Sequence, residues 1–112
     1  MLQPQESEIR LLHAQVCQAL ADPTRILLLY QLAEGPKHVG ELAAALGLSQ
    51  PSVSRHLKVL RERNMVRPTR IGNTIEYALS DRRAIQALDL LRSILHDSLS
   101  RQSELAGAFS TN

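Results

Sequence analysis

The spacing of apolar residues divides the chain into five helical segments and one pair of strands. The helices are expected at residues 5–20, 23–33, 39–46, 50–64 and 81–105. In four of them apolar side chains recur every three or four residues and therefore share one face. In residues 23–33 the run "ILLLYQL" is apolar nearly all round, as is typical of a buried central helix. The four apolar stripes are formed by Ile9, Leu12, Val16 and Leu20, by Val39, Leu42, Ala43 and Leu46, by Val53, Leu57 and Leu60, and by Leu88, Leu91, Leu95 and Leu99.

Local signals mark the ends of the central helices. Asp22 is a suitable N-cap for the second helix, and Pro23 fits the first helical position, where its missing N–H costs nothing. Gly47 ends the third helix, and Ser49 caps the fourth, with Pro51 in its first turn. Two short helices joined by a tight turn with glycine are typical of a helix-turn-helix.

Residues 65–80 change from helical to alternating spacing and predict a β-hairpin. Gly72-Asn73 suits a two-residue hairpin loop, and Pro68 in the first arm indicates an edge strand. A hairpin directly after a helix-turn-helix is the wing of a winged helix. We therefore expect a mainly α fold with a small β-hairpin, in the order helix, helix, helix, helix, strand, strand, helix. The tail, residues 107–112, is expected to be loose.

Length and composition fit one small domain. The chain has 112 residues, and we expect a single winged helix-turn-helix domain over residues 1–112. No apolar run is long enough to cross a bilayer and the N-terminus has no signal pattern, so we expect a cytoplasmic protein without a membrane partner. Cys17 is the only cysteine, which excludes an intrachain disulfide and a CxxC metal site.

Basic residues are concentrated in one third of the chain. Residues 49–83 contain eight Arg and Lys against three acids, a net charge of +5, whereas the remaining residues carry −3. Such a distribution is expected of a surface that meets phosphate, although a solvated basic face has the same composition.

The fourth helix combines an apolar side with a cationic side. Val53, Leu57 and Leu60 lie in a narrow arc of the helical wheel, and Arg55 and Lys58 lie opposite. This division suits a recognition helix, in which Arg pairs with guanine, Gln with adenine and Ser with phosphate. An ordinary amphipathic helix would look similar, but the surrounding helix-turn-helix and basic hairpin favour DNA binding. The predicted DNA contacts are Ser49, Gln50, Ser52, Ser54, Arg55, His56, Lys58, Arg67, Arg70, Asn73 and Thr74.

Three of these residues have a second interpretation. His56 lies on the flank of the buried stripe, so a packing or capping role fits it as well as a DNA contact. Arg67 and Arg70 are expected to reach phosphates or the minor groove, but arginines there would also keep a strand edge from pairing.

The segments "ALADPTRILLLYQL", "VGELAAALGLSQPSVSRHLKVLRERNMV" and "YALS" resemble the ArsR/SmtB family of bacterial transcriptional repressors. The resemblance covers about residues 16–80. It implies a homodimeric winged-helix repressor in which the first and last helices, about residues 5–20 and 81–105, build the subunit interface. A two-fold dimer would present two recognition helices to successive major grooves of a pseudo-palindromic operator, roughly 34 Å apart.

Members of this family are often metal or redox sensors, but the family's metal motifs are broken in this chain. His38 and Gly40 stand where one family site has two cysteines, and Leu91 and Leu99 stand where another has ligands. A non-standard site is an alternative: His13, Cys17, Asp89 and His96 would converge on Zn²⁺ or another divalent metal if the outer helices pack across the dimer. Alternatively, Cys17 is a small packing residue or a thiol sensor.

Other classes of function have less support in the sequence than DNA binding. The sequence contains no Gly-rich phosphate loop, nucleophile elbow or carboxylate pair, so we expect no enzyme. A winged-helix protein-interaction module would use the same basic face on an acidic protein, and a DNA-binding regulator without any effector is also open. Steep salt dependence and preference for one palindrome would identify the DNA binder.

Overall fold

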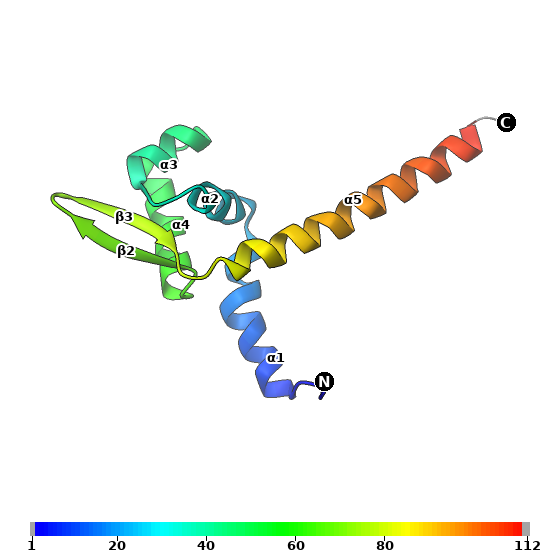
Figure 1. Cartoon of the computed structure of the whole chain (residues 1–112), viewed down its shortest axis with the longest axis horizontal. Helices are drawn as coiled ribbons and strands as arrows, with labels where there is room; N and C mark the ends of the chain where they lie inside the picture. The colour runs from blue at the N-terminus through cyan, green and yellow to red at the C-terminus, as the bar shows by residue number, and fades with distance from the viewer. Residues whose placement is uncertain (1, 111–112) are drawn as a thin grey trace. The chain divides into compact units, whose positions relative to one another are not determined.

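The computed structural model describes residues 2–110, except for the side chains of residues 105, 106 and 108–110. The chain forms two compact units, residues 1–82 and 83–112, and each is described by itself. In the first unit α2, α3 and α4 gather beside the hairpin of β2 and β3 (Figure 1). The elements are α1 (Glu6–Leu12), a π-helical turn (His13–Cys17), a 3₁₀ turn (Ala19–Ala21), α2 (Pro23–Ala33), β1 (Lys37–His38), α3 (Val39–Leu46), α4 (Gln50–Glu62), β2 (Val66–Ile71), β3 (Thr74–Leu79) and α5 (Arg83–Ser110).

The helix-turn-helix forms as its caps predict. The Asp22 carboxylate accepts a hydrogen bond from the Thr24 N–H at 2.8 Å, with Pro23 in the first turn of α2. Gly47 ends α3 with φ +65°, and the Ser49 hydroxyl oxygen accepts from the Ser52 N–H at 3.3 Å at the start of α4. These contacts set where α2 and α4 begin and where α3 ends.

The fourth helix ends at Glu62, two residues earlier than predicted. Asn64 adopts a left-handed conformation with φ +60°, and the Met65 N–H returns to the Leu60 carbonyl at 2.8 Å. This is the Schellman arrangement, in which asparagine replaces the more usual glycine. It turns the chain directly into β2.

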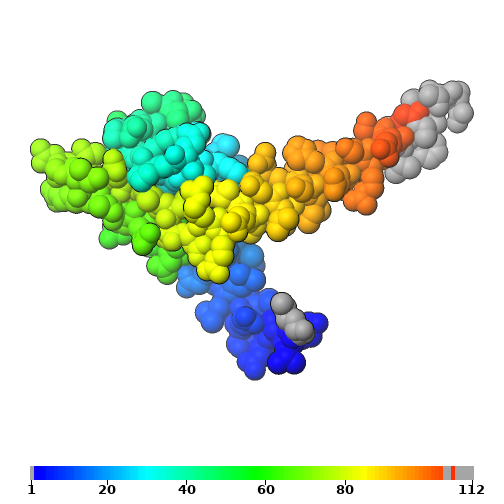
Figure 2. Space-filling view, viewed as in Figure 1, coloured from blue at the N-terminus to red at the C-terminus, as the bar shows by residue number. Residues whose placement is uncertain are grey.

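The core of the first unit lies between α2, α3, α4 and the base of the hairpin. The predicted stripes of α3 and α4 face inward, and Val53, Leu57 and Leu60 have no exposed surface. The largest fully buried side chains are Leu28, Leu29, Leu42, Leu57, Leu60, Val53 and Val66. In the space-filling view the atoms of the hairpin adjoin those of α3 (Figure 2).

The hairpin belongs to a three-stranded antiparallel sheet in the order β1-β3-β2. Ile71 pairs with Thr74 across the Gly72-Asn73 loop, and only Gly72 of the two loop residues has positive φ, as in a type II′ turn. Pro68 lies on the edge strand, as predicted. β1 was not predicted, because two residues carry no periodicity and their pairing with β3 is a tertiary contact.

The first helical segment differs from the prediction of one helix over residues 5–20. It is α-helical only to Leu12, continues as a π-helical turn in which the Gln18 N–H reaches the His13 carbonyl at 2.9 Å, and closes with a 3₁₀ turn. The Arg63 guanidinium donates to the Ala14 carbonyl at 2.7 Å inside this segment. The change of helix type rotates the apolar stripe, so its four residues do not share one continuous face. Ile9 and Leu12 are exposed, whereas Val16 and Leu20 are half-buried.

The last helix is longer than predicted. α5 runs from Arg83 to Ser110, so the expectation of a loose tail is wrong for residues 107–110; residues 111–112 lie outside the described part. Gly107 lowers helix propensity by about 1 kcal/mol relative to alanine, which does not suffice to end a helix. Of the predicted stripe, Leu88 is buried, while Leu91, Leu95 and Leu99 are exposed.

Candidate nucleic-acid interface

The two sides of α4 differ sharply in burial. Val53, Leu57 and Leu60 are completely buried, whereas Gln50, Ser54, Arg55 and Lys58 are exposed. Ser52 and His56 are half-buried at the border between the two sides. The cationic side of α4 is therefore open to a partner, and the opposite side holds the helix rigidly to the body of the unit.

The Ser49 hydroxyl caps α4 and retains a hydrogen to donate. Its oxygen accepts from the Ser52 N–H, and a hydroxyl that accepts one bond still has its own O–H. Ser49 is exposed, and it lies at the positive end of the α4 dipole. Both features suit a phosphate oxygen.

His56 lies toward the start of α2. Burial raises the pKa of Asp22, but the backbone N–H groups of Arg25 and Thr24, with the charges of His56 and Arg25, lower it more, so the pKa lies below its ordinary value. His56 itself is half-buried at the border of the two sides of α4. Its DNA contact and its packing role both stay predictions.

The hairpin separates its two arginines. Arg70 and Arg67 are three residues apart in β2, so they project from opposite faces of the sheet. Arg70 pairs across the strands with Ile75, and its Nε donates to the Gly72 carbonyl at 3.4 Å, whereas Arg67 pairs with Ala78. Asn73 and Thr74 are exposed at the tip. Arg70 therefore shares a face of the sheet with Ile75, which lines the groove beside α4, and Arg67 projects from the other face.

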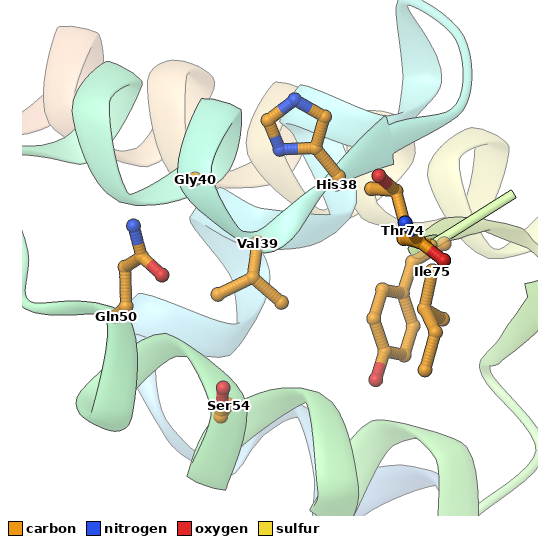
Figure 3. Close-up of a pocket in the computed structure, with 9 residues that line it drawn as sticks. His38, Val39, Gly40, Gln50, Ser54, Thr74 and Ile75 are labelled. Atoms are coloured by element: carbon orange, nitrogen blue, oxygen red, sulfur yellow. The ribbon is translucent and has the colours of Figure 1, made fainter. Parts of the chain in front are cut away.

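A groove of about 470 Å³ runs between the starts of α3 and α4 and the hairpin. Figure 3 shows Val39, Gln50 and Ser54 of the two helices on one side and Thr74 and Ile75 of β3 on the other. Four predicted DNA contacts meet here, two from α4 and two from the hairpin tip. The lining residues are His38, Val39, Gly40, Gln50, Ser54, Asn73, Thr74, Ile75 and Tyr77.

Five of the lining residues were not predicted as DNA contacts, and β1 and β3 explain why. His38 and Tyr77 reach the groove through strand pairing that local periodicity does not reveal. The alternating spacing of residues 65–80 predicted the strand that carries Tyr77, but not the direction of the tyrosine side chain.

His38 and Gly40 have structural roles at the start of α3. The His38 Nδ1 accepts from the Glu41 N–H at 3.2 Å, and the Glu41 carboxylate accepts from the His38 N–H at 3.1 Å, which forms a reciprocal capping box. A Cβ on residue 40 would lie 3.2 Å from the His38 ring and 3.6 Å from the Gln50 amide nitrogen. Glycine there keeps the imidazole and the glutamine in place.

The candidate metal ligands fall into two pairs. His13 and Cys17 are exposed at the two ends of the π-helical turn, and Asp89 and His96 are exposed on α5, with Asp89 in an ion pair with Arg92 at 3.3 Å. Among residues 2–110 of one chain, no three His, Cys, Asp or Glu side chains gather closely enough to hold a metal ion. Convergence of the two pairs across a dimer stays a prediction.

Within the described residues, no helix has both the length and the apolar character needed to cross a membrane.

Comparison with known proteins places this architecture in a family. The HTH-type transcriptional regulator NmtR of Mycobacterium tuberculosis is 42% identical over 86 residues, covering 77% of this chain and 72% of NmtR. The solution structure of the homodimeric winged helix-turn-helix DNA-binding domain of Mb0332 from Mycobacterium bovis superposes with a TM-score of 0.74 at 25% identity, covering 90% of this chain and 95% of that one. The crystal structure of the AntR antimony-specific transcriptional repressor gives a TM-score of 0.73 at 31% identity, covering 86% of each chain. Residues 22–67 match the family described as "Bacterial regulatory protein, arsR family". The predicted resemblance is confirmed: the chain belongs to the arsR family of bacterial regulatory proteins and has the winged helix-turn-helix fold.

Proposed function

We propose that this protein is a sequence-specific DNA-binding transcriptional repressor that acts as a homodimer. The observation that carries the proposal is the exposed cationic side of α4 beside the groove and the hairpin. The positive charge is concentrated in residues 49–83, which include α4 and the hairpin. A helix held by its buried side, with polar and cationic residues outward, is what the major groove accepts.

The exposed residues divide into base and phosphate contacts by their chemistry. Arg55 suits the O6 and N7 atoms of guanine, and Gln50, in the first turn of α4, suits adenine. The hydroxyls of Ser49 and Ser54, together with Lys58, suit phosphate oxygens, which fix the register of the helix on the duplex. Arg70, Asn73 and Thr74 extend the contact from the hairpin.

Apolar surface on α5 supports the homodimer. Among large apolar side chains of this helix, Leu90, Leu91, Ile94, Leu95 and Leu99 are all more than half exposed. A contiguous apolar surface of this kind is rare on a monomeric soluble protein. The Mb0332 domain, which has the same fold, is itself homodimeric.

A symmetric dimer explains how binding would repress transcription. Two copies of α4 would enter successive major grooves roughly 34 Å apart, so the operator would be pseudo-palindromic. A dimer that covers such a site excludes other proteins from it. The site of action would be the bacterial cytoplasm, where the chromosome lies.

The decisive experiment is selection of bound sequences from random duplexes, followed by affinity measurements on the selected sequence at several salt concentrations. We expect one pseudo-palindrome and an affinity that falls steeply as salt rises. Binding that prefers no sequence, or an acidic protein partner that random duplex DNA does not displace, would instead favour the protein-interaction module.

A second candidate, a metal or thiol response, is favoured by the π-helical turn. This turn exposes an imidazole and a thiol, His13 and Cys17, about one turn apart, and these groups suit Zn²⁺. Asp89 and His96 of the partner subunit would complete the set. The test is a zinc titration of operator affinity with wild type, His96→Ala and Cys17→Ser. Mass spectrometry after peroxide treatment tests Cys17 as a thiol sensor. If zinc leaves the wild-type affinity unchanged, zinc does not control DNA binding.

A further inference from the structure

We propose that Tyr77 is an additional DNA-contacting residue, which donates its phenolic O–H to a phosphate of the strand lying in the groove between α4 and the hairpin. This inference rests on the proposed function and extends it to a residue that the sequence analysis did not single out. It also assigns an occupant to the groove, namely one strand of duplex DNA.

The position of Tyr77 is fixed by the sheet. It lies in β3, the central strand, and pairs with Lys37 of β1 on one side and with Pro68 of β2 on the other. A residue held on both sides loses little conformational freedom when it binds a ligand. Its side chain lines the groove together with Gln50 and Ser54, so the strand directs it at the recognition helix.

The hydroxyl of Tyr77 is open to a ligand. Within residues 2–110 this hydroxyl makes no hydrogen bond to the protein. Among the buried and half-buried residues of the same range, no side-chain oxygen or nitrogen is both inaccessible to solvent and without a hydrogen bond. Tyr77 is half-buried, so its hydroxyl must reach solvent at the groove. A half-buried tyrosine with a free polar end is well suited to an interface.

The surroundings favour a nucleic-acid strand over other occupants. Gln50, Ser54, Asn73 and Thr74 supply neutral hydrogen-bond donors, and Ile75 offers an apolar wall for deoxyribose. Arg70 projects from the same face of the sheet as Tyr77. It pairs directly with Ile75, and Ile75 and Tyr77 are two residues apart in β3, so all three side chains share that face. Glu76, the nearest acid along β3, projects from the opposite face. Ser54, which lines the groove, and Lys58 are four residues apart and therefore share one face of α4, so a strand bound in the groove would also pass the cationic side of this helix.

The test is Tyr77→Phe, which removes only the hydroxyl. We expect a loss of about 10-fold in affinity, since a hydrogen bond to a charged group contributes at the lower end of its range when solvent is near. A phosphate contact carries no sequence information, so the factor should be the same for the selected operator and for an unrelated duplex. The thermal unfolding midpoint should not change.

Controls separate this contact from other effects. Tyr30→Phe removes a hydroxyl from α2, outside the groove, and should leave DNA affinity unchanged. Gln50→Ala should weaken the operator more than the unrelated duplex, which is the signature of a base contact. Inorganic phosphate at matched ionic strength should compete equally with wild type and Tyr77→Phe.

Three results would overturn the proposal: unchanged operator affinity of Tyr77→Phe, a loss confined to the operator, or phosphate competition that depends on the hydroxyl, which would identify a free-anion site. Each of these leaves the proposed repressor intact. A wild-type protein that binds no duplex would instead remove the proposed function itself.

Discussion

Asp22 and Arg25 show at the residue scale how the "ADPTR" segment works. The Asp22 carboxylate accepts from the N–H groups of Thr24 and Arg25, and the Arg25 guanidinium donates to the carbonyls of Ala19 and Gln18 at 2.8 and 3.0 Å. Asp22 therefore pairs free backbone N–H groups at the start of α2, and Arg25 pairs free carbonyl groups at the end of the preceding helical segment. The motif that helped to identify the family is a structural junction in this chain.

Replacing Asp22 tests this junction. Asp22→Ala should lower the free energy of unfolding by about 1 kcal/mol, because alanine cannot cap the helix, whereas Asp22→Asn should cost less. Urea denaturation measures both. If the asparagine variant is as unstable as the alanine variant, the negative charge of Asp22 stabilises the junction and its capping hydrogen bonds do not.

The same carboxylate gives a pH dependence. The pKa of Asp22 is lowered in the folded state, so its contribution to stability is present above the unfolded pKa and is lost as the pH falls through the folded pKa, below about pH 4. Comparison of wild type and Asp22→Asn in urea across this range isolates the effect. The difference in free energy of unfolding between the two proteins should shrink as the pH falls. A constant difference would contradict a lowered pKa of Asp22 in the folded state.

Arg55 and Arg70 should differ in what they contribute to binding. Arg55→Ala should cost about 1–3 kcal/mol and relax the base preference at one position of each half-site. Arg70→Ala should weaken all duplexes alike. Binding assays with the operator and its single-base variants distinguish the two, and operator affinity that survives Arg55→Ala would show that α4 does not lie in the groove as proposed.

At the scale of elements, the hairpin depends on its loop. Gly72 has φ +60°, a conformation in which alanine costs about 1–2 kcal/mol. Gly72→Ala should lower stability by about that amount, and Gly72→Asn by less, because asparagine tolerates positive φ. Thermal unfolding measures the effect. Equal stability of wild type and Gly72→Ala would mean that the loop adopts another turn in solution.

The first helical segment shows what local patterns miss at this scale. Its apolar spacing is that of an α-helix, yet the structure inserts a π-helical turn at His13–Cys17. The Arg63 guanidinium contacts a carbonyl inside this turn from a position 49 residues away. A single-segment pattern contains no information about such a partner.

For the whole molecule, the homodimer makes the clearest prediction. Leu95→Glu should produce a monomer, because it places a charge on the exposed apolar surface of α5. Loss of the second recognition helix should then reduce operator affinity by about 100-fold or more. Sedimentation and binding assays check both effects.

Ser100→Glu is the matched control for this dimer prediction. Ser100 is exposed on the polar side of the same helix, so its charge should leave both the oligomeric state and the operator affinity unchanged. A Leu95→Glu variant that stays dimeric would place the subunit interface elsewhere.

The sequence determined the central fold because the relevant forces there are local. Periodicity located α2, α3 and α4, and capping side chains at Asp22 and Ser49 set two helix starts almost to the residue. The Gly72-Asn73 loop fixed the register of the hairpin, since a two-residue loop allows only one pairing of its flanks. The polarity of α4, and with it most of the candidate interface, followed from the same periodicity.

Only the tertiary structure decided the features that depend on contacts between distant segments. Strand β1 exists because β3 pairs with it, and the π-helical turn coincides with a contact from Arg63. The groove arises where α3, α4 and the hairpin meet, so neither its shape nor the direction of Tyr77 could be derived from any one of them. Local sequence specifies backbone conformation and the polarity of a face, whereas the side chains that meet across a gap are specified by the packing of the whole unit.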